Sequence, residues 1–366
     1  MKVNVLKENL AKSLNTVGRI VSTKNSLPVL SHVLIKTEDG RLKLASTNLE
    51  IGITYKIGGK VEENGSITVP ARLFTELVNS LPGDKVEMSL NDLTLKIMSG
   101  NFKAEIKGIT AEDFPLIPDI KESKVLAMDN KTFRDALKLV SFAAAVDDSR
   151  PVLSGVYIVK EGKKLTFAAT DSYRLAEKNI TLSKDLGTDF SVIVPIRTIN
   201  EILKIVSDID GEINVYLSDN QISFEVDGVE LISRLIEGQY PNYRQIIPEG
   251  SETKANIKSA DFLNILKVAV LFARENGNTL SIKINPKGKI EVNVIASQVG
   301  SNESFLDADV TGKGGEISFN GRFIMDYIQN VNSKEISLEI TGELTPGIMR
   351  TAEIKDYVYI IMPLRS

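Results

Sequence analysis

The sequence predicts an α+β fold in which three similar domains each pack two helices on antiparallel sheets. Arg72, Arg197 and Arg322 recur at a constant spacing of 125 residues, and each stands two positions after the Pro or Asn that opens a helical segment. Between the expected helices, short runs rich in Val and Ile alternate with Gly turns, which is typical of antiparallel strands. A repeat this long is a domain, because solenoid repeats are much shorter.

Two further features place the domain boundaries. Residues 27–31 recur as residues 150–154, an offset of 123. The first two repeats each close on an aromatic residue followed by Pro, at Phe114 and at Tyr240. A chain of 366 residues is long enough for three units that each bury a core. The expected domains are therefore 1–122, 123–250 and 251–366.

Each repeat is expected to run helix, strands, helix, strands. In the first helix Leu6, Leu10 and Leu14 recur at helical spacing and form one apolar stripe. Gly followed by a basic residue marks three expected hairpins, at Gly40, Gly162 and Gly288. The six expected helices cover residues 6–21, 71–80, 131–146, 196–207, 258–274 and 321–331.

Charge is distributed unevenly between the expected helices and the rest of the chain. The 44 basic and 48 acidic residues give a net charge of −4, which taken alone argues against nucleic acid. The six expected helices nevertheless hold 13 basic and 6 acidic residues, which leaves 31 basic and 42 acidic residues elsewhere. Helix propensity for Lys and Arg is the alternative explanation, although Glu shares that propensity and is scarce in these helices. We expect basic helix faces that attract a duplex without reading its sequence.

No motif in the sequence predicts catalysis, a cofactor or a metal. The absence of cysteine removes disulfides, zinc–thiolate sites and thiol nucleophiles. The single histidine, His32, lies in a strand-like run and is expected to be structural. The acidic pairs at Asp147-Asp148 and Asp208-Ile209-Asp210 have no metal-binding spacing. Gly-rich phosphate loops and nucleophile elbows are also missing.

Four motifs carry a family resemblance that covers the whole chain. They are Leu-Pro-Val-Leu at 27–30, Thr-Asp-Ser-Tyr-Arg-Leu-Ala at 170–176, Tyr-Pro-Asn-Tyr-Arg at 240–244 and Ile-Ile-Met-Pro-Leu-Arg at 360–365. Together with the triple repeat, they make the chain resemble the beta subunit of bacterial DNA polymerase III, the replicative sliding clamp. The resemblance implies the DNA clamp fold, closed as a head-to-tail homodimeric ring with helices inside and sheets outside. Such clamps encircle double-stranded DNA and tether the polymerase III alpha subunit, the clamp loader and other clamp-motif proteins.

The resemblance also implies which side chains face DNA. Arg72, Arg197 and Arg322 are the first candidates, since a cation in the first turn of a helix is unfavourable by roughly a few tenths of a kcal/mol. A solvated helix start is the alternative explanation for each. Lys24 and Arg150 resemble family positions that touch DNA near the ring face.

Two copies would join through the first domain of one and the third domain of the other. By family position, Ile106 and its strand would meet Leu271 and Phe272 of the second copy. Ala104 stands where the best-known members carry Phe, so the strength of ring closure is an open property of this chain.

A groove for linear partner peptides is implied between the second and third domains. Gln245 stands where the best-known members have Arg, Phe323 where they have Tyr, and Ser172-Tyr173 where they have Gly-His. The pocket should therefore be less basic and its motif preference different. The residues that match groove positions are Leu153, Thr170, Ser172, Tyr173, Arg174, Leu175, Pro241, Ile246, Asn320, Phe323, Met362, Pro363, Leu364 and Arg365.

Two alternatives from other functional classes stay open at the level of sequence. One is a repeated, non-enzymatic scaffold that binds only proteins, and the other is a hydrolase with an unrecognised carboxylate site. The N-terminus has no apolar segment of signal-peptide length and no apolar run approaches the length of a membrane span. Because the chain also has no cysteine, we expect a cytoplasmic protein.

Overall fold

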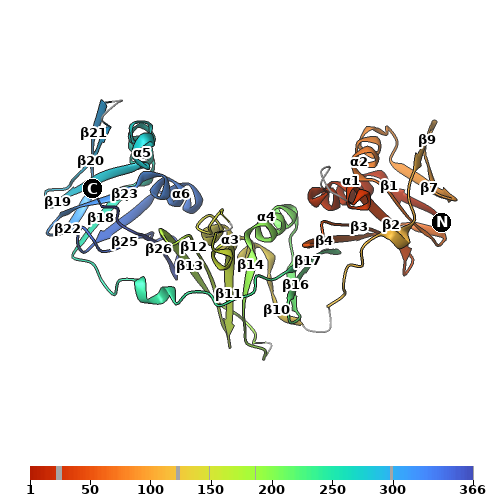
Figure 1. Ribbon diagram of the computed structural model, residues 1–366, viewed down its shortest axis with the longest axis horizontal. Coiled ribbons are helices and arrows are strands. Elements are labelled where there is room, and N and C mark those ends of the chain that lie inside the picture. Colours follow the sequence, from red (N-terminus) through yellow and green to blue (C-terminus); the bar gives the residue numbers. More distant parts are fainter. Residues whose placement is uncertain (22–26, 121–123, 148, 186, 297–299, 366) are drawn as a thin grey trace. The chain divides into compact units, whose positions relative to one another are not determined.

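The computed structural model describes residues 1–366 except 22–26, 121–123, 148, 186, 297–299 and 366. The described residues form six α-helices and four antiparallel sheets, which confirms the predicted α+β fold (Figure 1). Two compact units can be separated. Unit 1 comprises residues 1–134 and 200–235, and unit 2 comprises residues 135–199 and 236–366.

Unit 1 contains two sheets, here called A and B. Sheet A has the order β5-β1-β7-β8-β9, and sheet B has the order β10-β15-β16-β17-β4-β3-β2-β6. The strands of sheet A are β1 (Lys2–Leu6), β5 (Lys60–Glu63), β7 (Lys85–Asn91), β8 (Thr94–Ser99) and β9 (Phe102–Lys107). Those of sheet B are β2 (His32–Glu38), β3 (Arg41–Thr47), β4 (Ile51–Ile57), β6 (Ser66–Pro70), β10 (Lys124–Asp129), β15 (Glu212–Leu217), β16 (Gln221–Val226) and β17 (Val229–Arg234).

Two helices of unit 1 cover its strands. The helices α1 (Lys7–Val17) and α2 (Ala71–Ser80) pack on each other, α1 against β3 and β4 and α2 against β2 and β6. Their fully buried side chains include Leu10, Leu14 and Phe74, which fill the space between helices and sheets.

Unit 2 contains the other two sheets, C and D. Sheet C has the order β14-β11-β12-β13-β26-β25-β24-β18-β22, and sheet D has the order β21-β20-β19-β23. The strands of sheet C are β11 (Gly155–Glu161), β12 (Lys164–Thr170), β13 (Arg174–Thr181), β14 (Phe190–Pro195), β18 (Thr253–Lys258), β22 (Asp309–Gly312), β24 (Glu335–Ile340), β25 (Gly347–Arg350) and β26 (Tyr357–Ile361). Those of sheet D are β19 (Thr279–Asn285), β20 (Lys289–Ala296), β21 (Gly300–Asp307) and β23 (Gly315–Asn320).

Helix α5 (Ser259–Ala273) packs against β20 and β21 of sheet D and against α6 (Gly321–Val331). The helices α3 (Asn130–Ser141) and α4 (Ile196–Ile205) each have residues in both units. No helix among the described residues is long and apolar enough to cross a bilayer.

Every α-helix begins directly after a strand, which is why the repeat arginines recur so regularly. Pro70 ends β6, Pro195 ends β14 and Asn320 ends β23, and the helix starts at the next residue. Asn320 Oδ1 accepts the backbone N–H of Arg322 at 3.0 Å, a standard N-cap. Each arginine is therefore the second residue of its helix.

The predicted hairpins are confirmed, and two predicted helices are shorter in the structure. The helix predicted at 131–146 is α3, which ends at Ser141. Gly40, Gly162 and Gly288 have φ of 70°, 56° and 88° and connect β2 to β3, β11 to β12 and β19 to β20. The first helix is shorter than the predicted 6–21, because Leu6 belongs to β1 and Gly18 begins a 3-10 turn, Gly18–Ile20. Leu6 is 51% exposed and so does not belong to the apolar stripe.

Two sheets combine strands from successive sequence repeats. β17 pairs with β4 in sheet B, and β26 pairs with β13 in sheet C, both antiparallel. Within each of these two sheets, the hydrogen bonding between strands thus continues from one repeat to the next. The domain boundaries 1–122, 123–250 and 251–366 stay a prediction from the repeat.

Candidate peptide groove and nucleic-acid interface

The three repeat arginines occupy equivalent places in α2, α4 and α6. Arg72, Arg197 and Arg322 are all exposed. Arg72 Nε donates to Glu76 Oε1 at 2.8 Å, one helical turn further along. An exposed ion pair at this spacing contributes little to stability. Because this ion pair is weak, the Arg72 guanidinium can also bind an anion outside the helix.

The other two residues predicted to face DNA are placed differently. Lys24 lies outside the described residues. Arg150 is exposed and precedes the 3-10 helix η4 (Pro151–Leu153), and its Nη1 donates to Ser172 Oγ at 2.7 Å. The structure therefore brings Arg150 to a loop that carries predicted groove residues.

That loop is shaped by side chains that bond to its own backbone. Asp171 Oδ1 accepts the N–H groups of Tyr173 and Arg174, each at 2.9 Å. Thr170 Oγ1 donates to the carbonyl of Arg174 at 2.6 Å and accepts the N–H of Ser172 at 3.1 Å. This Asx-type turn holds Ser172 at φ 77°, in the left-handed region that side-chain-bearing residues rarely adopt. As a result Tyr173 is 54% exposed while Arg174 is buried.

The Arg174 guanidinium pairs with two carboxylates inside unit 2. Its Nε lies 3.0 Å from Asp171 Oδ2 and its Nη1 lies 2.5 Å from Asp326 Oδ2. Its Cζ lies 4.5 Å from the centroid of the Phe323 ring and 5.7 Å from that of Phe142, both within cation–π range. Because two carboxylates already neutralise it, Arg174 shapes the groove wall and does not offer a free cation to a ligand.

Apolar side chains form the floor beneath this wall. Among the predicted groove residues, Leu153 and Leu175 belong to one buried cluster together with Ile360. Tyr243 also belongs to it, and its hydroxyl donates to Glu177 Oε2 at 2.6 Å. Burial and the neighbouring carboxylate raise the pKa of the Tyr243 phenol, so it stays a neutral donor. The floor is therefore apolar, and its Tyr243 hydroxyl is satisfied by a carboxylate.

The C-terminal segment runs along the same part of unit 2. Met362 N–H donates to the carbonyl of Tyr173 at 2.8 Å, and Leu364 N–H donates to the carbonyl of Ser318 at 2.8 Å. Met362, Pro363 and Leu364 are half-buried. The segment after β26 is thus tied at two points and forms a fixed edge, where a free terminus normally frays.

The remaining predicted groove residues have mixed surroundings. Asn320 caps α6 and also donates to the carbonyl of Gly277 at 3.3 Å. Pro241, Ile246 and Arg365 are exposed. The hydrogen bonds and contacts above bring together Thr170, Ser172, Tyr173, Arg174, Phe323 and Met362 with the floor residues Leu153 and Leu175.

The residues predicted to join two copies lie in different units. Ile106, in β9, is only 4% exposed and pairs with Leu95 of β8. Phe102 lies four residues before Ile106, on the same face of β9, and is 56% exposed. In unit 2, Leu271 of α5 is 54% exposed and Phe272 is half-buried.

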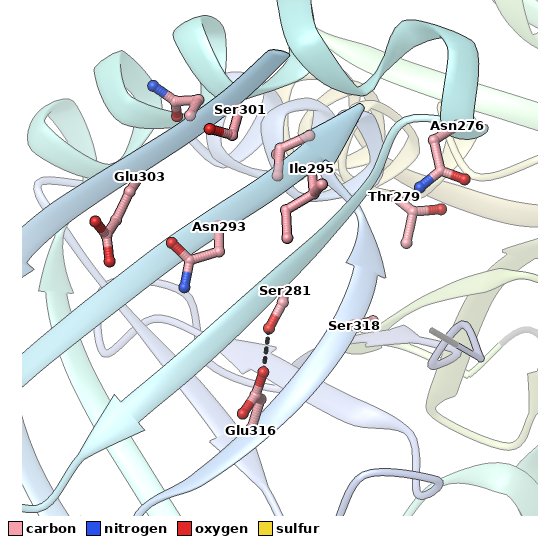
Figure 2. Close-up of a pocket in the computed structure, with 11 residues that line it drawn as sticks. Asn276, Thr279, Ser281, Asn293, Ile295, Ser301, Glu303, Glu316 and Ser318 are labelled. Carbon is pink, nitrogen blue, oxygen red and sulfur yellow. Dashed lines mark hydrogen bonds between the residues drawn. The ribbon is translucent and has the colours of Figure 1, made fainter. Parts of the chain in front are cut away.

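A separate hollow of about 540 Å³ lies on sheet D (Figure 2). Most of its lining residues have polar side chains, and among them Ser281 Oγ donates to Glu316 Oε1 at 2.7 Å. Ile295 is 79% exposed at this surface. The hollow shares no residue with the predicted groove, although Ser318 lines it and also accepts the Leu364 N–H.

His32 and Asp147, which were considered for catalysis, make contacts that hold the local structure. His32 Nδ1 lies 3.3 Å from Thr68 Oγ1, and burial lowers the pKa of the imidazole. Asp147 Oδ1 accepts the Ser149 N–H at 3.0 Å, which closes a local turn. Among the described residues, no cluster of three His, Asp or Glu side chains could hold a metal ion.

Comparison with known proteins places the whole chain in one family. Residues 1–118, 127–242 and 244–365 match in succession the N-terminal, central and C-terminal domains of the DNA polymerase III beta subunit. The chain belongs to the DNA polymerase III beta subunit family. This membership decides against the protein-only scaffold that the sequence left open.

Individual members of the family agree over their full length. The Beta sliding clamp of Staphylococcus epidermidis is 29% identical, with 100% of both chains covered. The crystal structure of the DNA polymerase sliding clamp from Bacillus subtilis has a TM-score of 0.94 at 27% identity and covers 100% of this chain and 99% of that one. The sliding clamp from Bartonella birtlesii, solved bound to griselimycin, has a TM-score of 0.93 at 28% identity, with both chains fully covered.

Two functional candidates were missed from the sequence. Phe142 and Asp326 both contact the Arg174 guanidinium. Asp326 had a signal, because an acidic residue follows each repeat arginine by four positions, at Glu76, Glu201 and Asp326. Phe142 had none, since an aromatic residue at a helix end looks like core.

Proposed function

We propose that this protein is a non-catalytic sliding clamp: two copies close head to tail around duplex DNA and hold polymerase III and other partners on it. The single observation that supports this most strongly is the unbroken series of three family domains along the chain. The domains would be 1–122, 123–250 and 251–366. We expect the clamp to act in the cytoplasm, where bacterial DNA is replicated, and to need no cofactor.

The proposed grip on DNA is weak and independent of sequence. Exposed arginines at helix starts offer mobile charges to phosphate, and phosphate contacts position a protein without specifying bases. Many nearly equivalent registers along the duplex then allow sliding. The proposed contacts are Lys24, Arg72, Arg150, Arg197 and Arg322.

Retention on circular DNA tests this proposal. The clamp loaded onto nicked circular DNA should stay bound and should escape after linearisation. Replacing Arg72, Arg197 and Arg322 by Gln should shorten residence and flatten its dependence on salt while the dimer persists. A matched control replaces three exposed lysines outside the helices, at Lys60, Lys164 and Lys313. Equal residence for all three proteins would contradict the assignment.

The proposed ring closes through one edge strand of sheet A and one edge strand of sheet D. β9 ends sheet A and β21 ends sheet D, and along one side of each no other strand of the described residues pairs with it. Lys103 and Lys107 on β9 complement Glu303 and Asp307 on β21. The predicted residues Ile106, Leu271 and Phe272 would supply the apolar centre. Phe102 supplies an exposed aromatic side chain on the same strand as Ala104, which stands where the best-known members carry Phe.

A substitution at Phe102 tests the closure. Phe102→Asp should convert the dimer to monomer in light scattering, because a charge would be buried at the joint. Leu93→Asp, which changes a 51% exposed leucine of the neighbouring turn, is the control. A dimer that survives Phe102→Asp would exclude this residue from the interface.

The proposed partner site is the groove in unit 2, made of apolar walls with few polar groups, which suits an anchored linear peptide. Deleting residues 362–366 should abolish polymerase binding, because it removes the edge fixed by Met362 and Leu364. The ring should persist, since these residues lie outside the proposed dimer edges. A deletion of Ser366 alone is the control. Undiminished polymerase binding to the longer deletion would refute the groove.

A further inference from the structure

A loop of unit 1 has the same internal hydrogen bonds as the groove loop of unit 2. Thr47 Oγ1 donates to the carbonyl of Ile51 at 3.0 Å and accepts the N–H of Leu49 at 3.0 Å. Asn48 Oδ1 accepts the N–H groups of Glu50 and Ile51 at 3.1 and 2.8 Å. Leu49 has φ 75°. Each of these bonds, and the positive φ, recurs 123 residues later in the groove loop.

The strand edge beside the loop is repeated as well. Arg234 N–H donates to the carbonyl of Glu50 at 3.1 Å, as Met362 N–H donates to the carbonyl of Tyr173 in unit 2. The 3-10 helix η2 (Pro28–Ser31) corresponds in the same way to η4. Unit 1 therefore contains a second copy of the backbone frame that forms the proposed partner groove.

This second frame encloses a hollow of about 270 Å³. Seven of its lining residues are the repeat counterparts of predicted groove residues, namely Thr47, Leu49, Glu50, Ile51, Gly52, Pro115 and Arg234. The other lining residues belong to the connecting segment around Leu116 and to β16 and β17. All of these residues lie in unit 1.

The hollow differs from the groove in its side chains. Leu116 is 91% exposed and Leu49 is 50% exposed, so two leucines border it in water. Arg234 stands at the place that Met362 has in unit 2, and no carboxylate of the described chain forms a salt bridge with it. An unpaired guanidinium beside exposed leucines complements a segment that offers a carboxylate next to an apolar side chain.

We propose that this hollow is a second peptide site, which takes an extended partner segment carrying a leucine-like side chain beside an acidic one. The leucine-like side chain would pack against Leu49 and Leu116, and the carboxylate would pair with Arg234. The inference rests on the proposed groove function, because that function assigns a ligand class to the shared frame. A clamp would then hold one partner at two points, or two partners at once, with a gain in effective concentration.

Binding of one defined peptide tests this proposal. The probe is a fluorescein-labelled peptide, Gly-Ser-Leu-Asp-Leu-Ser-Gly, with photoleucine in place of leucine for cross-linking to the full-length clamp. We expect two equivalents bound per protomer, with cross-links at the unit 1 hollow and at the unit 2 groove. Leu116→Arg should remove only the first set, and Ile246→Arg should remove only the second. Leu93→Arg, another exposed leucine of unit 1, should remove neither.

A further variant tests the predicted chemistry of the second site. Arg234→Met gives unit 1 the groove residue of unit 2. In the Ile246→Arg background it should reduce the preference for the Asp peptide over its Asn analogue by about fivefold, the upper end for an exposed ion pair.

The two proposals fail in distinguishable ways. One equivalent of peptide that is lost in Ile246→Arg and unchanged in Leu116→Arg overturns the second site and leaves the groove standing. One equivalent that is lost in Leu116→Arg alone, with no cross-link in unit 2, supports the second site and contradicts the groove for this peptide. Absence of cross-links at the unit 1 hollow at millimolar peptide overturns the second site whatever happens in unit 2.

Discussion

The loops 47–52 and 170–175 have the same backbone and different side chains. In both, a Thr hydroxyl and an Asn or Asp side chain make the same bonds to the main chain. The buried residue at the end of the turn is Ile51 in one loop and Arg174 in the other. The frame is thus set by the side chains of two short polar residues, while the surface it presents is set by the side chains of the residues whose backbone groups they bond.

The strands next to each loop also share a backbone and differ in their side chains. In unit 1, Glu38 Oε atoms lie 3.3, 3.4 and 3.2 Å from the ammonium groups of Lys36, Lys43 and Lys56. The counterparts of these lysines 123 residues later are Val159, Thr166 and Asn179. One frame therefore accommodates a charged strand face in unit 1 and a largely uncharged one in unit 2.

The largest effect is expected from giving unit 2 the buried residue of unit 1. Arg174→Ile removes a buried cation and leaves Asp171 and Asp326 without it. Breaking a buried ion pair costs about 3–5 kcal/mol, and the 41% exposure of the Asp326 side chain places the expected cost near the lower end, roughly 3 kcal/mol. Urea denaturation measures this cost.

A double variant separates the ion pair from packing. Arg174→Ile combined with Asp326→Leu removes both partners, so it should recover part of the loss. Strictly additive costs in the double variant would mean that the pair itself contributes nothing and that Arg174 acts through its contacts with Phe323 and Phe142.

A smaller effect is expected from removing the polar residue that frames each loop. Asp171→Ala removes the acceptor of two backbone N–H groups and of the Arg174 Nε–H, so it should destabilise the protein by about 2 kcal/mol. Asn48→Ala removes the acceptor of two N–H groups only and should cost about 1 kcal/mol. Equal losses in thermal unfolding would show that the bond to Arg174 adds no stability.

The sequence was most informative where the determinants are local. Gly40 and Gly162 marked hairpins because a positive φ favours Gly, and the repeat arginines marked helix starts because Pro or Asn ends the preceding strand. Leu6 was misplaced because its spacing continues the helical stripe although its backbone belongs to a strand. Periodicity alone does not distinguish these two outcomes.

The parts that sequence did not predict depend on contacts between distant residues. Arg174 was matched to the groove by its motif, but its partner Asp326 lies 152 residues further along the chain. Arg150 was matched to DNA, yet its guanidinium donates a hydrogen bond to Ser172. Which side chain meets a given residue depends on strand pairing, here β13 with β26, and this pairing has no local signal.

Acidification should affect the charged strand face of unit 1. Burial raises the pKa of Glu38, but the surrounding lysines outweigh it and lower the pKa to about 2. A carboxyl group whose pKa is lowered by folding stabilises the protein above its unfolded pKa, and this stabilisation is lost as the pH falls toward 2. Because the group is partly exposed, we expect only about 1 kcal/mol.

Glu38→Gln tests this expectation. The variant should be about 1 kcal/mol less stable than the parent protein at pH 7, and the difference should shrink as the pH falls through 4 toward 2. Glu161→Gln changes the counterpart in unit 2, where Val159, Thr166 and Asn179 stand in place of the three lysines, and is the control. A constant difference between Glu38→Gln and the parent across this range would exclude the carboxylate charge as its cause.

The smallest effect is expected to be stabilising and concerns the strained residue in each loop. Leu49→Gly relieves a φ of 75°, which favours the folded state, while the added freedom of the unfolded chain opposes it, so the net gain should be about 0.5–1 kcal/mol. Ser172→Gly relieves the same strain but removes the acceptor for Arg150 Nη1–H, so its gain should be smaller. If Ser172→Gly gains as much as Leu49→Gly in urea denaturation, the Arg150 hydrogen bond contributes nothing to the groove loop, and Arg150 is free to serve DNA as its family position implied.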